Sequence, residues 1–257
     1  MTRLRSTLGA DLVKSGEEVE LMRKAGRELA RIRRQLVSLV HPGISTLELD
    51  KVAQRMIESI GAKPAFLGYH GYPASICTSI NEEVVHGIPS NKRYLRPGDI
   101  ISIDTGLILN GFFSDTAITV AVGEVDPEVA RLVAVTAKAL ELGIAALRPG
   151  RRIGDVSAAI ERYVEGEGYS VVREYTGHGI GRQMHEEPKV PNFGEPGKGM
   201  RLKAGMVLAL EPMVNRGTWK TQVQANGWTV ITADRLPSAH FEHTVALSKD
   251  GAEILTV

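Results

Sequence analysis

The amino-acid sequence predicts an α+β fold built from two similar halves. Three observations lead to this prediction: helical periodicity that starts at capping signals, two long β-rich runs joined by Asn110-Gly111, and an internal repeat with an offset of 107 residues. Together they indicate two α+β units that pack about a pseudo-two-fold axis. We expect a flexible arm at residues 1–14 and a single domain at residues 15–257, with halves at about 15–124 and 125–257.

The repeat is visible in two apolar runs that each end in an acid. Residues 95–104 read LRPGDIISID, and residues 202–211 read LKAGMVLALE, which is an offset of 107. The same offset relates a Pro-Gly pair at 42–43 to one at 149–150, and a glycine at 61 to one at 168. Three separated landmarks with one offset indicate an internal duplication. The matching acids, Asp104 and Glu211, should therefore meet where the halves face each other.

Each half opens with two predicted helices. The first two begin at capping boxes, in which Ser15 precedes Glu18 and Ser45 precedes Glu48 by three residues. Asp126 followed by proline begins the third helix. Apolar periodicity and Pro-Gly or glycine stops predict helices over residues 15–40, 45–61, 126–147 and 154–165. Residues 62–98 and the chain after 165 read mainly as short strands and loops.

A β-hairpin lies between the two pairs of helices. The runs Asp99–Leu109 and Phe112–Val122 are rich in β-branched residues and are joined by Asn110-Gly111. Asn-Gly between two such runs is a strong hairpin signal, because both turn residues must adopt positive φ.

Each hairpin strand carries one acid in an otherwise apolar or hydroxyl-bearing run, Asp104 and Asp115. A two-residue turn places Asp115 opposite Gly106. The same register places Asp104 opposite Ala117, so the two carboxylates share one face, roughly 5–8 Å apart at Cβ. Burial of two unpaired carboxylates is unfavourable, which predicts a cation between them. The structural alternative is that Asp115 caps a bulge and Asp104 forms an ion pair.

Composition restricts the class of protein. The chain has 257 residues, 43% of them hydrophobic and 24% charged, with a net charge of +1. This balance gives no reason to expect a membrane or a specific nucleic acid as the main partner. The single cysteine, Cys77, favours a reducing compartment, and the N-terminal residues lack the apolar core of a secretory signal. We therefore expect a cytoplasmic protein.

The second half contributes further side chains of the metal-ligand type. His178 lies among glycines in TGHGIG, His185 follows in HEEP, Glu211 ends an apolar strand, and Glu242 begins another. Taken singly, each has a structural explanation, such as a hydrogen-bonded core histidine or a glutamate paired with lysine. Together, four carboxylates and one imidazole suit two divalent ions such as Mn, Fe(II), Co or Zn. Hydrolysis of an amide or ester is the chemistry that such a pair favours.

These residues lie in motifs that resemble a known family. SINEEVVHGIP, IDTG, NGFFSDTA, TGHGIGRQMHEEP, MVLALEPM and HFEHT are similar to motifs of the methionine aminopeptidases of the short bacterial type I class. The resemblance runs from about Ser15 to the C-terminus. It implies the pita-bread (creatinase/aminopeptidase) fold, in which helices pack outside a curved, mainly antiparallel sheet, and it makes residues 15–257 a catalytic domain.

The resemblance also implies a metal centre. It assigns two divalent ions to five ligands: Asp104, Asp115, His178, Glu211 and Glu242. Asp115 and Glu242 would bridge both ions. Asp104 would complete one ion, and His178 with Glu211 would complete the other.

The activity implied is removal of the N-terminal methionine from nascent proteins and peptides, with preference for a small second residue. A hydroxide between the two ions would attack the first peptide bond. Glu211 would move the proton toward the leaving amine, His185 would steady the scissile carbonyl, and His86 would contact the scissile amide nitrogen.

A methionine pocket follows from the same match. Its walls would be Phe66, Tyr69, Tyr72, Cys77, Met184 and Trp228. The structural alternative for these residues is ordinary core packing. Nothing in the sequence activates Cys77 as a nucleophile, so an apolar wall is its expected role. His240 stands where relatives often have glutamine, and the sequence assigns it no role.

Two other functions compete with this interpretation. Xaa-Pro peptidases and creatinase-like enzymes share the fold but carry an extra N-terminal domain, whereas this chain reaches its first repeat by about residue 15. The type II class has a late helical insertion, for which the 31 positions between Glu211 and Glu242 leave little room. The second competing function is that of a non-catalytic binding protein that kept the fold. Such a protein would have lost metal ligands, whereas all five are present in this chain. We expect a monomer that acts on nascent chains in the proximity of the ribosome.

Overall fold

The computed structural model describes residues 12–257, so most of the predicted arm at residues 1–14 lies outside the described residues. Lys14, at the end of that arm, is buried. Its Nζ lies 2.5 Å from Oε2 of Glu186, and its backbone N–H donates to the carbonyl of Gly205. The chain is therefore anchored to the second half where the first helix begins.

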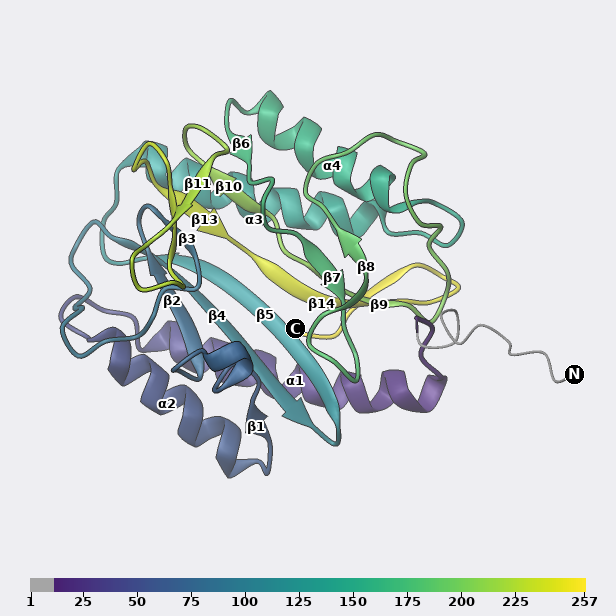
Figure 1. Cartoon of the computed structure of the whole chain (residues 1–257), viewed down its shortest axis with the longest axis horizontal. Coiled ribbons are helices and arrows are strands. Elements are labelled where there is room, and N and C mark those ends of the chain that lie inside the picture. The colour runs from purple at the N-terminus through teal and green to yellow at the C-terminus, as the bar shows by residue number, and fades with distance from the viewer. Residues whose placement is uncertain (1–11) are drawn as a thin grey trace, which may run out of the picture.

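Four α-helices lie where the sequence predicts them, and they flank a central sheet (Figure 1). Their bounds are α1 Gly16–Ser38, α2 Thr46–Ser59, α3 Pro127–Ala146 and α4 Ile153–Gly166. In Figure 1, α1 and α2 lie in the lower part of the view, and α3 and α4 lie in the upper part. Within residues 12–257, no helix combines the length and the apolar character needed to cross a membrane.

The helix starts follow the capping signals. The Ser15 hydroxyl accepts a hydrogen bond from the N–H of Glu18, and the Glu18 carboxylate accepts from the N–H of Ser15 at 2.7 Å. Ser45 and Glu48 form the same reciprocal pair at the start of α2. These bonds satisfy two backbone donors that a helix start otherwise leaves unpaired. Asp126 caps α3, with proline at its first position.

The repeat predicted from the sequence is present in the backbone. An offset of 107 carries both ends of α2 onto both ends of α4, since 46 + 107 = 153 and 59 + 107 = 166. It also carries the bridge between Ser45 and Tyr94 onto the bridge between Arg152 and Arg201. The two halves thus share their scaffold down to single hydrogen-bonded pairs.

The main sheet has nine strands, and all its described pairings are antiparallel. Its order is β1-β4-β5-β14-β9-β7-β8, with β2 beside β4 and β15 beside β14. Their bounds are β1 Lys63–Pro64, β2 Ile76–Ile80, β4 Ile100–Leu109, β5 Phe112–Ala121, β7 Gly177–Gly179, β8 Glu186–Val190, β9 Val207–Leu210, β14 Glu242–Leu247 and β15 Ala252–Ile254.

Two three-stranded sheets, β13-β10-β6 and β11-β12-β3, complete the fold together with the short 3₁₀ turn η2. Their bounds are β3 Glu83–Val85, β6 Ser170–Val171, β10 Met213–Asn215, β11 Thr221–Val223, β12 Val230–Thr232, β13 Ser238–His240 and η2 Tyr69–Gly71.

The hairpin has the predicted register. Asn110 and Gly111 both adopt positive φ, 53° and 81°. Asp104 pairs with Ala117, and Gly106 pairs with Asp115. The two acids therefore lie on one face of the sheet, as the turn predicts.

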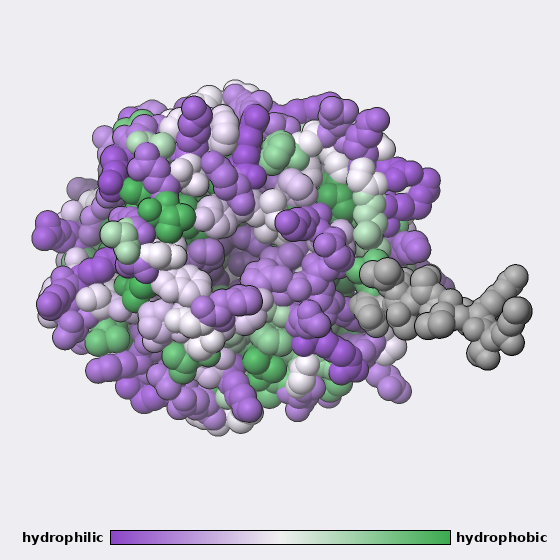
Figure 2. All heavy atoms as spheres, viewed as in Figure 1, coloured by the Kyte–Doolittle hydropathy of each residue, from purple (hydrophilic) through white to green (hydrophobic). Residues whose placement is uncertain are grey.

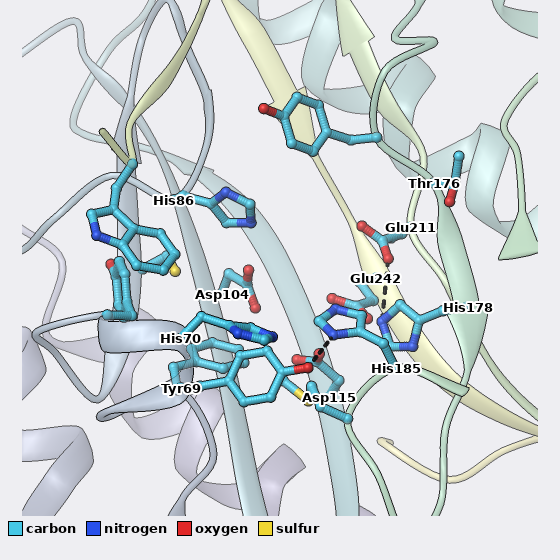
Figure 3. Close-up of a pocket in the computed structure, with 16 residues that line it drawn as sticks. Tyr69, His70, His86, Asp104, Asp115, Thr176, His178, His185, Glu211 and Glu242 are labelled. Carbon is cyan, nitrogen blue, oxygen red and sulfur yellow. Dashed lines mark hydrogen bonds and ion pairs between the residues drawn. The ribbon is translucent and has the colours of Figure 1, made fainter. Parts of the chain in front are cut away.

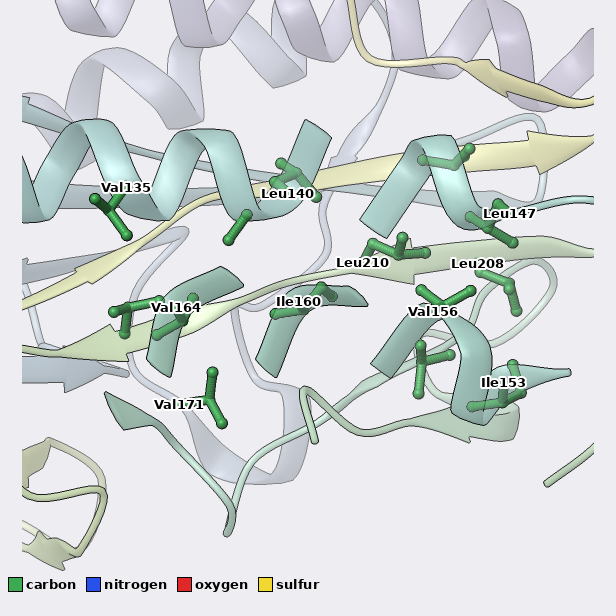
Figure 4. Packing of buried hydrophobic residues seen from close by; sticks show 14 of the residues in the cluster. Val135, Leu140, Leu147, Ile153, Val156, Ile160, Val164, Val171, Leu208 and Leu210 are labelled. Atoms are coloured by element: carbon green, nitrogen blue, oxygen red, sulfur yellow. The ribbon is translucent and has the colours of Figure 1, made fainter. Parts of the chain in front are cut away.

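Apolar side chains of the helices pack on the sheet in each half. In the second half, α3 contributes Val135 and Leu140, α4 contributes Ile160 and Val164, and β9 contributes Leu210 (Figure 4). A matching cluster joins α1 and α2 to the hairpin strands. The helices bury their apolar faces on the outer side of the sheet, so the opposite face remains for a site.

Candidate active site and metal centre

Side chains from both halves line up across the inner face of the sheet. In a first row, Asp104 on β4 lies opposite Ala117 on β5, and Ala117 lies opposite Glu242 on β14. The register between β14 and β9 continues this row to Glu211, the residue after β9. The carboxylates of both halves thus share one line, and the small side chain of Ala117 leaves space between them.

A second row runs beside the first. The N–H of Asp115 donates to Oγ1 of Thr244 at 3.0 Å, and the Thr244 hydroxyl donates to the Asp115 carbonyl at 2.8 Å. Thr244 lies opposite Ala209 on β9, and Ala209 lies opposite His178 on β7. The two rows bring all five predicted metal ligands to one cavity of about 250 Å³ (Figure 3). In the space-filling view this face is hollowed near its middle (Figure 2).

The four carboxylates are held in surroundings that disfavour their charge. Asp115 is 5% exposed and Glu242 is 2% exposed. Burial raises the pKa of Asp104 to about 7. Burial also raises the pKa of Asp115, Glu211 and Glu242 well above the ordinary carboxylic range, and the neighbouring carboxylates add to the effect. Such a cluster needs either protons or a cation.

His178 presents a lone pair to this cluster. Its Nδ1–H donates to the carbonyl of Gly179 at 2.9 Å, which leaves Nε2 as an acceptor. Nε2 lies 3.5 Å from Oε1 of Glu211. Burial lowers the pKa of His178 to about 4, so the ring is neutral at physiological pH. Two acceptors that face each other indicate that a positively charged group belongs between them.

The donor set fits a divalent metal. Asp115, His178 and Glu242 each offer one ligand atom, and these atoms lie within 4.8 Å of one another. Among the described residues, Oδ1 of Asp104 and Oε1 of Glu242 are buried without any hydrogen-bond partner. Oxygen donors with one imidazole suit Mn, Fe(II), Co or Zn. The orphaned oxygens are therefore explained if the cavity binds metal.

Two of the predicted catalytic histidines flank the cluster. His86 follows β3 with φ of 60°, an uncommon conformation for a residue with a side chain. Its ring packs edge-on against Tyr175 and Trp228, and burial lowers its pKa to about 4. The ring of His185 lies 4.4 Å from that of His178, centroid to centroid.

Tyr69 holds His185 from the first half. The Tyr69 hydroxyl lies 2.8 Å from Nδ1 of His185. When the tyrosine O–H donates to Nδ1, the imidazole proton is on Nε2. His185 can then donate from Nε2. Tyr69, predicted as a wall of the methionine pocket, therefore also contacts a candidate catalytic residue.

The cavity has an apolar end beside Asp104. Cys77 pairs with Asp104 across β2 and β4, and Tyr72 stacks edge-on against Trp228 at 5.1 Å. Phe66 and Met184 are buried in the same cluster. Burial, assisted by the charge of Asp104, raises the pKa of the Cys77 thiol well above its ordinary value, which opposes a nucleophilic role.

All thirteen residues predicted for the site line this one cavity. Three further residues line it that the sequence did not single out: His70, Tyr175 and Thr176. Tyr175 and Thr176 directly precede the TGHG glycines, so nearness to that motif was the available signal. His70 lies in η2 with φ of 49°, and no periodic pattern indicates where its side chain points.

Comparison with known sequences identifies the family. Residues 20–249 match the profile of metallopeptidase family M24. The chain belongs to metallopeptidase family M24. The metal-binding character of this M24 cavity thus agrees with the family.

Relatives of this M24 chain are similar over its whole length. The methionine aminopeptidase of Clostridium acetobutylicum is 50% identical over 246 residues, which is 96% of this chain and 98% of the relative. The crystal structure of a methionine aminopeptidase from Rickettsia prowazekii has a TM-score of 0.93 at 44% identity and covers 95% of this chain and 99% of that chain. The predicted pita-bread fold is therefore confirmed.

A more distant M24-like structure shares only the fold. The prolidase from Pyrococcus horikoshii OT3 has a TM-score of 0.80 at 22% identity. The match covers 97% of this chain but 65% of that chain. The prolidase thus has substantial chain beyond the part that this protein resembles.

Proposed function

We propose that this M24 metallopeptidase is a methionine aminopeptidase, which removes the N-terminal methionine from nascent proteins and peptides and prefers a small second residue. The observation that carries the proposal is the cavity itself. Four carboxylates and an imidazole meet on one face of the sheet, next to an apolar recess formed by Phe66, Tyr72, Cys77 and Trp228. The near-full-length relatives that bear this name support the same conclusion.

The metal centre of this proposal has two divalent ions, Co, Mn, Fe(II) or Zn, held by Asp104, Asp115, His178, Glu211 and Glu242. Within this set, Asp115, His178 and Glu242 offer ligand atoms that lie within 4.8 Å of one another, so these three would hold metal together. When bound, such ions would acidify a water molecule and polarise the substrate carbonyl. The protein residues supply the remaining steps.

Three side chains have roles toward the peptide. Glu211 would accept the proton of the attacking water and pass it to the leaving amine. His185, oriented by Tyr69, donates from Nε2 to the carbonyl oxygen as negative charge develops there. His86 contacts the scissile amide nitrogen. All three residues line the cavity.

The position of the acids explains why only the first residue would be removed. The free α-amine of a substrate is attracted to the carboxylate cluster beside Asp104. The apolar end of the cavity, beside Asp104, then receives the first side chain. The flexible, polarizable side chain of methionine suits a recess with aromatic and sulfur-containing walls.

The cellular setting follows from the proposed substrate. Because nascent chains are made in the cytoplasm, we place the enzyme there, in the proximity of the ribosome. We propose that it acts there as a monomer.

A peptide assay tests the proposal. Purified protein with Mn(II) or Co(II) should release methionine from Met-Ala-Ser, and should release little of the first residue from an Xaa-Pro peptide. Asp104→Asn should lower kcat at least about 100-fold, because it removes a proposed ligand. Asp250→Asn, in an exposed turn, is the matched control and should stay within about twofold of wild type.

Two results would contradict the proposal. One is absence of metal-dependent methionine release by the wild-type protein. The other is preferential cleavage of Xaa-Pro peptides, which would assign the chain to the prolidase type of activity. An Asp104→Asn protein with full activity would remove Asp104 from the metal centre.

A further inference from the structure

His240 is a buried histidine next to the site whose role the proposed mechanism leaves open. It ends β13, is 2% exposed, and does not line the cavity. Among the described residues, its Nε2 has no hydrogen-bond partner. The nearest acidic atom to Nε2 is Oε2 of Glu211, at 4.0 Å. A buried orphan nitrogen that faces a carboxylate requires an explanation.

The backbone of His240 is fixed by one hydroxyl. Its N–H donates to Oγ1 of Thr119 at 2.8 Å, and the Thr119 hydroxyl donates back to the His240 carbonyl at 2.8 Å. Oγ of Ser102 lies 2.8 Å from the same Thr119 oxygen. Because the Thr119 proton is already donated to His240, the Ser102 hydroxyl must be the donor in this contact. His240 also pairs with Met213 on β10. With its backbone held from two sides, the imidazole has little freedom except rotation of the ring.

Glu211 is held from its other side. The backbone carbonyl of Glu211 accepts a hydrogen bond from Nδ2 of Asn192 at 3.1 Å. Its side-chain Oε1 lies 3.5 Å from Nε2 of His178. One imidazole therefore faces each carboxylate oxygen. His178 presents a lone pair to Oε1, whereas the ring nitrogen that faces Oε2 can carry a proton, since nothing else in the described chain bonds to it.

We propose that His240 is a positioning residue for Glu211: its Nε2–H donates to Oε2 and fixes the plane of the carboxylate, so that Oε1 stays directed to the cavity beside His178. The inference rests on the proposed function, in which Glu211 binds metal and moves a proton. The gap of 4.0 Å exceeds a hydrogen bond by about 1 Å. Catalytic hydrogen bonds are often long before the site is filled, and a small rotation of either side chain closes this gap.

Two amide variants of His240 test whether a hydrogen-bond donor is needed at the position of Nε2, or whether any polar side chain is sufficient. The amide nitrogen of His240→Gln can reach the position of Nε2, whereas that of His240→Asn reaches only the position of Nδ1. Gln should keep kcat for Met-Ala-Ser within about threefold of wild type. Asn should lower kcat about tenfold and leave KM within about twofold, because the carboxylate loses its orientation and the peptide pocket does not change.

A second measurement does not depend on peptide cleavage. Co(II) is titrated into metal-free protein, and visible absorption reports binding. Because Glu211 is a proposed ligand, His240→Asn should weaken one Co(II) binding step about tenfold and alter its spectrum, and His240→Gln should restore both. If wild-type protein released no methionine, the proposed function would fail, yet this titration would still test the contact between His240 and Glu211.

A double-mutant cycle identifies the partner. In a Glu211→Gln background, His240→Asn should change Co(II) affinity by no more than about twofold, because its effect passes through the carboxylate. Thermal melting of every variant, with the exposed His41→Asn as control, separates unfolding from loss of orientation.

Three outcomes would overturn the inference. His240→Asn could match wild type in kcat and in Co(II) binding. Gln and Asn could be equally impaired, which would mean that the ring matters only for packing. The effect of Asn could persist in the Glu211→Gln background, which would mean that His240 acts elsewhere. Where His240→Asn does not fold, His240→Gln provides the comparison together with Thr119→Val, which removes the hydroxyl that bonds both the backbone of His240 and Ser102. A smaller loss is expected for Thr119→Val alone.

Discussion

The two halves of this molecule have the same scaffold and use it differently. The second helix of each half, its glycine stops and its bridging pair coincide at an offset of 107 residues. In the first half, however, the acids lie inside two ten-residue strands of a regular hairpin. In the second half, His178 lies on a strand of three residues and Glu211 lies just after a strand of four.

The difference shows which parts of a duplicated fold tolerate change. Helix stops depend on short local signals, and both halves keep them, at Gly61 and Gly168. In a long hairpin, successive side chains must point to alternate faces of the sheet. The strands of the second half are short, and residues beyond their ends do not follow this alternation. An imidazole and a glutamate could therefore enter there, opposite two aspartates whose positions the hairpin register determines.

The largest expected effect comes from breaking the register of the first half. One glycine inserted between Asn110 and Gly111 should lower activity at least about 100-fold, because a one-residue shift turns one of the two aspartates to the opposite face. Methionine release and Co(II) titration measure the loss. A glycine inserted between Glu124 and Val125, in the loop before α3, is the control. Full activity in the hairpin variant would show that the pairing does not determine the site.

The next effect concerns the charge that the two halves share. Without metal, burial raises the pKa of Asp104 from 3.8 to about 7, and the other three acids shift in the same direction. The folded chain therefore binds more protons than the unfolded chain above pH 4, so these acids make stability fall as pH rises through 7. The buried histidines act oppositely, but only below about pH 6.5, where the unfolded imidazole titrates.

The melting temperature of metal-free protein in a chelator should therefore fall by at least about 2 °C between pH 6.5 and pH 8. Added Mn(II) should raise it more at pH 8 than at pH 6.5, since cation binding needs ionised carboxylates. Asp104→Asn, which removes one titrating group, should reduce the fall. A metal-free melting temperature that rises over this interval would mean that the acids do not share a site.

A smaller effect is expected at the contact between the halves that Tyr69 makes. Tyr69→Phe removes the hydroxyl that orients His185, so kcat should fall about three- to tenfold with a lesser change in KM. Steady-state kinetics on Met-Ala-Ser measure it. Tyr94→Phe, at a side chain 55% exposed, is the matched control. An unchanged kcat would leave Tyr69 as a pocket wall only.

The smallest effect is expected at the N-terminal caps of α2 and α4, which occupy matching positions in the two halves. Ser45 at the start of α2 corresponds to Arg152 at the start of α4. Only Ser45 has a side-chain oxygen that caps its helix, so Ser45→Ala should lower the free energy of unfolding by about 1 kcal/mol. Arg152→Ala should cost about half as much or less. Urea unfolding at constant metal concentration measures both, and activity should not change. Equal losses would mean that the two caps contribute alike.

Local signals in the sequence were sufficient for the helices, the hairpin and the repeat. Capping boxes and glycine stops act within a few residues, and the Asn110-Gly111 turn determines the register of its own strands. Motif resemblance then selected thirteen residues, and all of them line one cavity.

What the sequence could not predict depends on contacts between distant segments. The row that joins Asp104 to Glu211 passes through Ala117 and Glu242, and no local pattern gives that pairing. Nor does any pattern predict that Tyr69 reaches His185, 116 residues away. His70 could not be predicted, because a 3₁₀ turn of three residues has no apolar periodicity from which the direction of a side chain can be inferred.

The seam between β5 and β14 has a consequence for how the protein assembles. It consists of two residue pairs, and it joins Ala117 to Glu242, which lie 125 positions apart in the chain. Contacts between such distant positions form late in folding, because a long loop must close first. During synthesis the hairpin emerges well before its partner strand, so the metal centre is complete only after β14 has joined β5. A cation that binds there would contact side chains from both halves, and it would add to the contacts that already join them, such as the hydrogen bonds between Asp115 and Thr244.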